Sequence, residues 1–161
     1  MSIQVENPEI EKLKLSSTAR KAAYLLIKKH PTIEFTSGRR NKKGQARAMA
    51  SNVVKNRNWI KETYAKSKAS LKCQKWVDDN PEKTKKTEIR IGLEGVLNSL
   101  NDRQLSRLSK HLSGDAFDVR PITSRAKTRK AKKIKRTIRR LPGITKFLAK
   151  EGGLVRWHAQ F

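Results

Sequence analysis

The sequence is short of cysteine, of acidic residues and of aromatic residues, and each shortage excludes something. A single cysteine, Cys73, excludes an intramolecular disulfide, so packing alone must hold the fold together. Only 14 Asp and Glu residues stand against 39 Lys and Arg, and the resulting formal charge of +25 points to an anionic partner. Aromatic residues make up 6% of the chain, which leaves little base stacking for recognising single-stranded nucleic acid.

Long apolar runs are missing as well. No run approaches the ~18 apolar residues of a membrane-spanning helix, so we expect no transmembrane segment. Residues 1–6 lack the basic and apolar regions of a secretory signal, and we therefore expect a protein made in the cytoplasm without a signal peptide. At 161 residues, the chain suits a single domain over residues 1–161.

Histidine is scarce too, and two of the three histidines lie in informative places. His111 precedes Asp118 by seven positions across a glycine turn at Gly114, and His158 lies in an alternating segment near the end of the chain. Imidazole nitrogen and carboxylate oxygen are both ligands that zinc accepts. The third histidine, His30, precedes a proline at the end of a predicted helix, and we do not expect it to bind metal.

Three short elements together resemble one family, the zinc D-Ala-D-Ala carboxypeptidases and the related L-alanyl-D-glutamate endopeptidases, which include many phage endolysins. Their order along the chain is also that of the family. In this sequence the elements are Ser37-Gly38-x-Arg40, Ser109-x-His111-x-x-Gly114-x-Ala116-x-Asp118 and Trp157-His158.

The resemblance implies an α+β fold in which a small antiparallel sheet carries a zinc site and helices surround it. It implies that zinc is bound by His111, Asp118 and His158, that Arg40 grips a substrate carboxylate, and that Ser37 and Ser109 help to position the substrate. The implied activity is zinc-dependent hydrolysis of a peptide bond in peptidoglycan stem peptides. Such an enzyme reaches the bacterial cell wall through holin release or as part of the virion.

The sequence departs from the family in two places. The separation of Arg40 from His111 is long, which implies inserted helices over residues 44–102. The family usually places an acidic general base three residues before the last histidine, where this chain has Val155. The nearest acid is Glu151, and it could serve as the base if it reaches back across the turn at Gly152-Gly153.

Sequence patterns predict further elements. Capping residues predict a short helix that begins near Pro8 and a second that begins near Ser17 and ends before Pro31. The other predicted elements are a strand at 32–36, helical segments over 44–79 with a break near 56–58, a helix at 89–100, a short helix through Phe147-Leu148 and a strand at 155–161.

The most basic segment, residues 124–141, predicts an amphipathic helix with a narrow apolar stripe and a cationic face. Ten of the seventeen residues 124–140 are Lys or Arg, and we expect this face to bind an anionic cell-wall or outer-membrane surface. The alternative is a peptidase-fold protein with weak or no activity that binds nucleic acid or another polyanion, for example a structural virion protein that also contacts other virion proteins. The predicted polyanion-binding residues are Lys130, Lys132, Lys133, Lys135, Arg136, Arg139 and Arg140.

Overall fold

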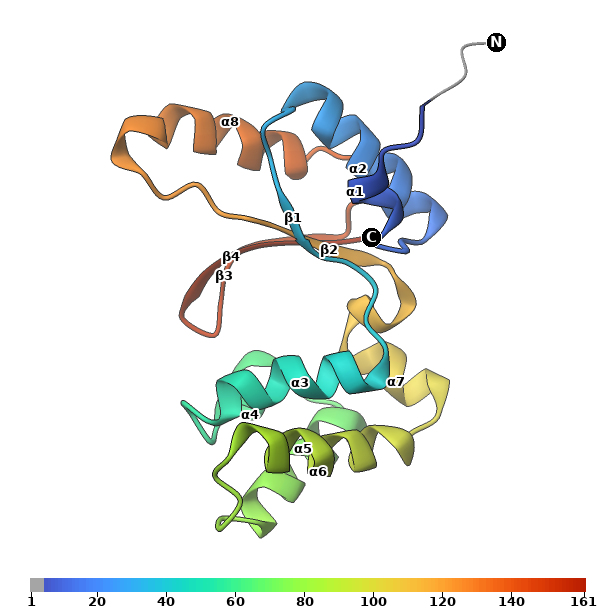
Figure 1. The fold of residues 1–161 in the computed structure, drawn as a ribbon, viewed down its shortest axis with the longest axis vertical. Coiled ribbons are helices and arrows are strands. Elements are labelled where there is room, and N and C mark those ends of the chain that lie inside the picture. The colour runs from blue at the N-terminus through green and yellow to red at the C-terminus, as the bar shows by residue number, and fades with distance from the viewer. Residues whose placement is uncertain (1–4) are drawn as a thin grey trace. The chain divides into compact units, whose positions relative to one another are not determined.

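The computed structural model describes residues 5–161, so the first four residues of the segment in which we expect no signal peptide lie outside it. The described residues form eight α-helices and one four-stranded antiparallel sheet (Figure 1), which confirms the predicted α+β class. None of the helices in this part of the chain combines the length and the apolar character that crossing a membrane requires.

The chain is organised as two compact units, each with an apolar core of its own. The sheet unit contains residues 5–39 and Ser113–Phe161, and the helical unit contains Arg40–Leu112. From the sequence we expected one domain with helices inserted over residues 44–102. The helical unit includes that whole range.

Two short helices open the sheet unit where the capping residues predict them. Helix α1 spans Pro8–Glu11, and the side chain of Asn7 accepts a hydrogen bond from the Glu9 N–H. Helix α2 spans Ser17–Lys29 and is capped in the same way by Ser16. Both predictions are confirmed, and Pro31 explains why α2 ends where it does.

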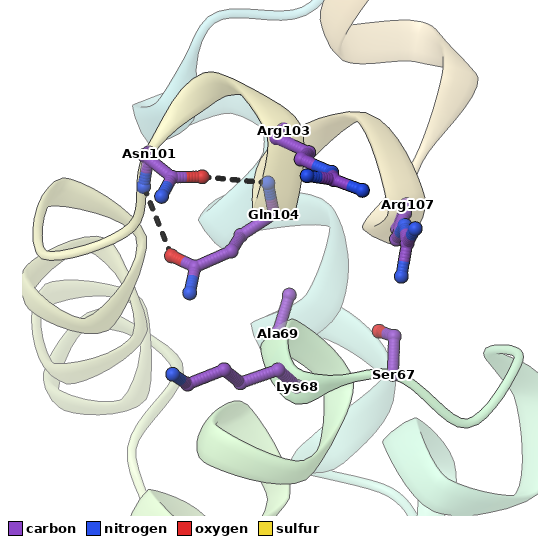
Figure 2. A pocket seen from close by; sticks show the side chains of 7 residues that line it. All are labelled: Ser67, Lys68, Ala69, Asn101, Arg103, Gln104 and Arg107. Carbon is purple, nitrogen blue, oxygen red and sulfur yellow. Dashed lines mark hydrogen bonds between the residues drawn. The ribbon is translucent and has the colours of Figure 1, made fainter.

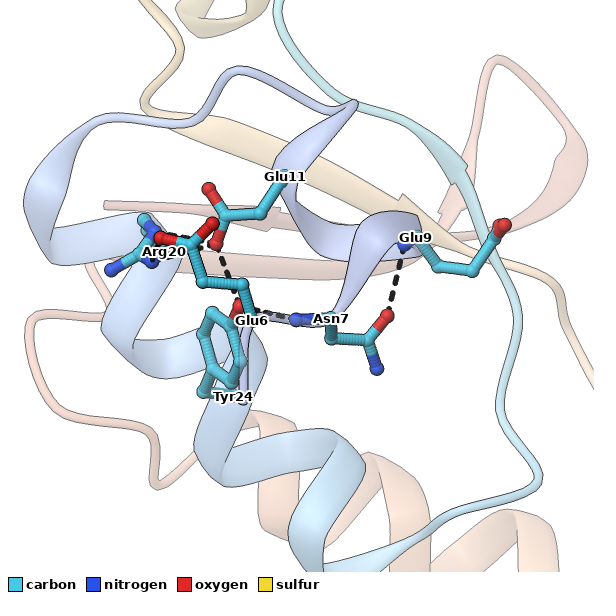
Figure 3. Close-up of polar contacts among 6 residues, drawn as sticks. All are labelled: Glu6, Asn7, Glu9, Glu11, Arg20 and Tyr24. Carbon is cyan, nitrogen blue, oxygen red and sulfur yellow. Dashed lines mark hydrogen bonds and ion pairs between the residues drawn. The ribbon is translucent and has the colours of Figure 1, made fainter. Parts of the chain in front are cut away.

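A polar network ties these two helices together (Figure 3). The Glu11 carboxylate accepts hydrogen bonds from the Arg20 guanidinium at 2.8 Å and from the Tyr24 hydroxyl at 2.6 Å. The Tyr24 oxygen in turn accepts from the Asn7 N–H at 2.8 Å. Arg20, followed by Tyr24, lowers the pKa of Glu11, so the network holds this carboxyl group in its charged form.

The four strands are β1 (Phe35–Ser37), β2 (Ala116–Val119), β3 (Lys146–Glu151) and β4 (Leu154–Gln160), in the spatial order β1-β2-β4-β3. The predicted strand at 32–36 is shorter and later in the structure. The predicted helix through Phe147-Leu148 is wrong, because this segment is β3. Gly152 and Gly153, with φ of 56° and 79°, form a tight turn that pairs β3 with β4.

The sheet has one face packed on helices. Figure 1 shows α1, α2 and α8 (Thr128–Ile138) on the same side of it. Phe117 and Trp157 point into this core and are buried against apolar residues of α2 and α8. Since side chains alternate along a strand, the residues next to these two, Asp118 and His158, lie on the opposite face.

The helical unit consists of α3 (Lys42–Val53), α4 (Trp59–Thr63), α5 (Lys68–Asp79), α6 (Lys86–Asn98) and α7 (Asp102–Leu108). The predicted break near residues 56–58 is confirmed, whereas a second break at 64–67 and the whole of α7 were not predicted. Cys73 is buried in the core of this unit, and burial raises the pKa of its thiol to about 12. The thiol is therefore a packing group.

Candidate metal centre

His111 lies on a short 3-10 turn, η1 (Lys110–Ser113), that follows α7 directly. Helix α7 ends at Leu108, and the backbone of Ser109 after it is extended. The Ser109 hydroxyl accepts a hydrogen bond from the His111 N–H at 3.3 Å. The His111 residue is only 3% exposed. Ser109 thus holds the turn that presents this imidazole, a structural role for a residue that we predicted to contact substrate.

Asp118 and His158 lie directly opposite each other on the antiparallel strands β2 and β4. Residues paired in this way point to the same face with their Cβ atoms about 4.5–5.5 Å apart. The His158 Nδ1 is 2.7 Å from the Asp118 Oδ1. Their side chains are 6% and 13% exposed, so the pair is largely shielded from solvent.

The three predicted ligands come together. One ligand atom from each of His111, Asp118 and His158 lies within 4.8 Å of the other two. Ligands about 2.1 Å from one tetrahedral ion are roughly 3.4 Å apart, so small side-chain adjustments would suit a shared metal. Two imidazoles and a carboxylate are a donor set that zinc accepts, and iron(II) also binds such a set.

A fourth side chain, Gln160, contacts the far side of His158. It lies two residues along β4 on the same face, and its amide nitrogen is 2.9 Å from the His158 Nε2. A glutamine amide carries both a donor and an acceptor, so Gln160 can pair with either tautomer of this ring nitrogen. Metal-binding histidines commonly use such a partner to fix the ring. In the sequence, the only sign of this contact is that Gln160 lies two residues after His158 in the predicted strand.

Two motif glycines lie against the loop that follows α1. A Cβ on Gly38 would come within 2.6 Å of the Leu13 backbone, and Gly114 has φ of +77°. The Gly114 carbonyl accepts a hydrogen bond from Ser16 N–H, and the Arg39 N–H donates to the Leu13 carbonyl. The loop thus joins the segment before Arg40 to the segment before Asp118, and both close approaches depend on glycine.

The Arg40 backbone lies next to that of the predicted metal ligand His111, because the Arg40 N–H donates to the His111 carbonyl at 2.9 Å. Its guanidinium donates to the Gln45 Oε1 at 3.4 Å, and the Gln45 amide donates to the Tyr64 hydroxyl at 3.1 Å. Gln45 is fully buried. Gln45 and Tyr64 therefore help to orient the predicted substrate-binding arginine, and no sequence motif had singled them out.

Ser37, the other predicted substrate-binding residue, pairs with Asp118 between β1 and β2. Direct pairing places Ser37 on the same sheet face as Asp118 and His158. The three predicted metal ligands therefore lie together. Ser37 pairs with the strand that carries Asp118, and Arg40 is hydrogen-bonded to the backbone of His111.

The predicted base Glu151 does not join them. On β3, Leu148 pairs with His158 and Lys150 pairs with Val155, so β4 contains one extra residue between these pairs. Leu148 and Lys150 are two residues apart and share a face, which places Val155 on the face of His158. Glu151 pairs with Leu154 and lies on the opposite face. The bulge thus places Val155, and not Glu151, on the sheet face of His158.

The predicted cationic helix forms, as the 3-10 turn η2 (Arg125–Lys127) followed by α8. Ala131, Ile134 and Ile138 are buried in the core of the sheet unit, which confirms the apolar stripe. The opposite face is cationic, and Lys130 donates to the hydroxyl of Thr32, three residues after the end of α2. Burial, then Lys29, Lys130 and Lys133, lower the pKa of His30, which reflects the positive potential here.

Comparison with known protein families, with curated proteins and with solved structures finds no match for this chain.

Proposed function

We propose that this protein is a zinc-dependent peptidase that cleaves a peptide bond in peptidoglycan stem peptides. The observation that carries the proposal is the cluster of His111, Asp118 and His158 within 4.8 Å. These ligands come from two separate parts of the chain and were singled out beforehand by the family motifs. A structural Asp–His pair alone would not account for a second, equally buried histidine at the same place.

The residues of the site would have separate roles in this reaction. Zinc bound by the cluster would act as a Lewis acid on the scissile carbonyl and activate water. Gln160 would keep the His158 ring turned so that Nδ1 remains available as a ligand. Arg40 would bind a substrate carboxylate such as that of D-Ala, D-Glu or diaminopimelate through two parallel hydrogen bonds, which lysine could not reproduce.

General base catalysis is the weak point of this site. The position that faces the cluster is occupied by Val155, which has no titratable group. A role for Glu151 would require the β3–β4 hairpin to rearrange, since the register places it on the other face. A positioned base contributes about 10²–10⁴-fold to rate, so we expect turnover to be slow by that margin compared with an enzyme that has the acid.

The place of action that fits this chemistry is the bacterial cell wall, reached through holin release or from the virion as a phage endolysin or virion-associated hydrolase. The cationic face of α8 would hold the enzyme on an anionic cell-wall or outer-membrane surface. That role does not depend on the metal, because none of the basic residues of α8 belongs to the cluster.

Hydrolysis of purified peptidoglycan fragments, with released amines and carboxylates measured by mass spectrometry, tests the proposal. We expect the zinc-loaded protein to release products and Asp118→Ala to release none. His30→Ala is the matched control, because His30 bonds to Thr137 away from the cluster. Hydrolysis that survives Asp118→Ala, or zinc-loaded protein with no hydrolysis, would contradict the proposed activity.

A second candidate function is favoured by Val155 and by α8 together. A protein that keeps the metal-site architecture, lacks the base and exposes a strongly cationic helix would bind nucleic acid or another polyanion, for example as a structural component of a virion. This alternative predicts normal polyanion binding and no hydrolysis under any metal condition.

A further inference from the structure

A pocket in the helical unit takes no part in the proposed chemistry. It lies between the start of α5 and helix α7 and has a volume of about 210 Å³ (Figure 2). This is well above the ~10–15 Å³ that a cavity needs in order to hold one water molecule. The lining residues are Ser67, Lys68, Ala69, Asn101, Arg103, Gln104 and Arg107.

The charges around this pocket are all of one sign. Lys68, Arg103 and Arg107 line it, and no carboxylate does. Within residues 5–161, none of these three cations forms an ion pair or a hydrogen bond. Arg103 and Arg107 are four residues apart on α7, a spacing at which like charges destabilise a helix. An anion between them would relieve that repulsion.

A neutral donor, the Gln104 amide, also lines the pocket and is held in place by hydrogen bonds. The Gln104 Oε1 accepts from the Asn101 N–H at 3.1 Å, and the Asn101 Oδ1 accepts from the Gln104 N–H at 2.9 Å. This reciprocal cap turns the Gln104 amide nitrogen toward the pocket, as Figure 2 shows. The nitrogen makes no hydrogen bond to any other described residue, so it is available to a ligand.

We propose that this pocket binds the phosphoryl group of a small phosphate ester. Arginine forks suit both carboxylate and phosphate oxygens. A phosphate monoester carries about −1.5 to −2 charges at pH 7, which matches three cations better than the single charge of a carboxylate. The volume leaves room beside the phosphoryl group for an organic part such as a glycerol or sugar unit.

Titration of the full-length protein with inorganic phosphate, glycerol 3-phosphate and acetate, followed by amide NMR, tests this proposal. We expect saturable shifts at Ser67–Ala69, at residues 101–107 and at the Gln104 side-chain amide. Glycerol 3-phosphate should bind more tightly than inorganic phosphate, and acetate at least tenfold more weakly than either. Arg103→Gln combined with Arg107→Gln should weaken binding at least tenfold, and Lys68→Gln should weaken it as well.

The matched control is Arg136→Gln with Arg140→Gln, which removes the same charge from a second cationic pocket, of about 290 Å³, beside α8. This variant should bind glycerol 3-phosphate as the wild type does. His111→Ala should also bind normally, so the result is independent of the proposed peptidase activity. Equal losses in both arginine variants, shifts centred on α8, or acetate binding as tight as phosphate would overturn the proposal. The substituted lysine and arginine side chains are exposed, so their replacement does not put folding at risk.

Discussion

Val155 and Leu154 are neighbours in β4, yet their side chains leave the sheet on opposite faces. Val155 pairs with Lys150 and shares the face of His158, whereas Leu154 pairs with Glu151. They are 50% and 43% exposed, so neither contributes much to a core. The two positions differ mainly in what an introduced carboxylate would face.

Val155→Glu is expected to raise the rate of stem-peptide hydrolysis at least tenfold. The new carboxylate would face the candidate metal cluster, and the opposite-charge pair with Lys150 would be tolerated or slightly stabilising. Initial rates on a defined stem peptide provide the measurement. Leu154→Glu adds the same charge on the other face and should leave the rate unchanged. Equal rates for Val155→Glu and the wild type would show that Val155 does not occupy the base position.

Residue identity and spacing in the sequence were enough to predict all three members of the cluster, because metal ligands of given chemistry recur in short motifs. They were not enough for Gln160, Gln45 and Tyr64. Their contacts depend on strand register and on packing between helices, neither of which a one-dimensional pattern contains. The position of Glu151 could not be predicted for the same reason: the sheet face of a side chain near the turn depends on one extra residue in β4, and the sequence pattern does not reveal that residue.

Some helices and strands were predicted from the sequence and others were not. Helices that begin at a capping residue, such as α1 and α2, were predicted closely because the cap is local chemistry. Strand β3 was predicted as a helix, because its six residues carry no strong strand signal and owe their conformation to the turn at Gly152-Gly153 and to pairing with β4. Helix α7 was missed because its seven residues are too few for a periodic pattern.

Helix α8 supports a prediction about binding. Replacing Lys132, Lys133, Lys135 and Arg136 by glutamine should weaken binding to double-stranded DNA and reduce the slope of log affinity against log salt by up to about 3 to 4, since each lost phosphate contact removes about 0.9. Fluorescence anisotropy at several salt concentrations measures both quantities.

A matched variant separates this effect from net charge. Lys55, Lys61, Lys66 and Lys72 are exposed residues of the helical unit, and their replacement by glutamine removes the same four charges. This variant should keep most of the affinity and nearly the whole slope. If both variants lose affinity equally, the polyanion is attracted by overall charge and α8 is not its binding surface.

For the whole molecule, composition supports a prediction about the class of partner but not about the architecture. A formal charge of +25 is a property of the entire chain and needs no structure to be recognised. The division into two units, each with its own apolar core, could not be read from the sequence, since neither boundary at residues 39–40 and 112–113 carries a linker-like composition. The three predicted metal ligands are therefore the most specific prediction that the sequence supports for the molecule as a whole.

Metal content of the purified, tag-free protein tests that statement most directly. Elemental analysis after dialysis should find about one zinc per chain in the wild type and in His30→Ala, and almost none in His111→Ala or in wild type treated with a chelator. Zinc that returns on reconstitution of the wild type, but not of His111→Ala, would support the proposed site. Absence of zinc from reconstituted wild type, stoichiometric iron in its place, or zinc retained by His111→Ala would contradict it.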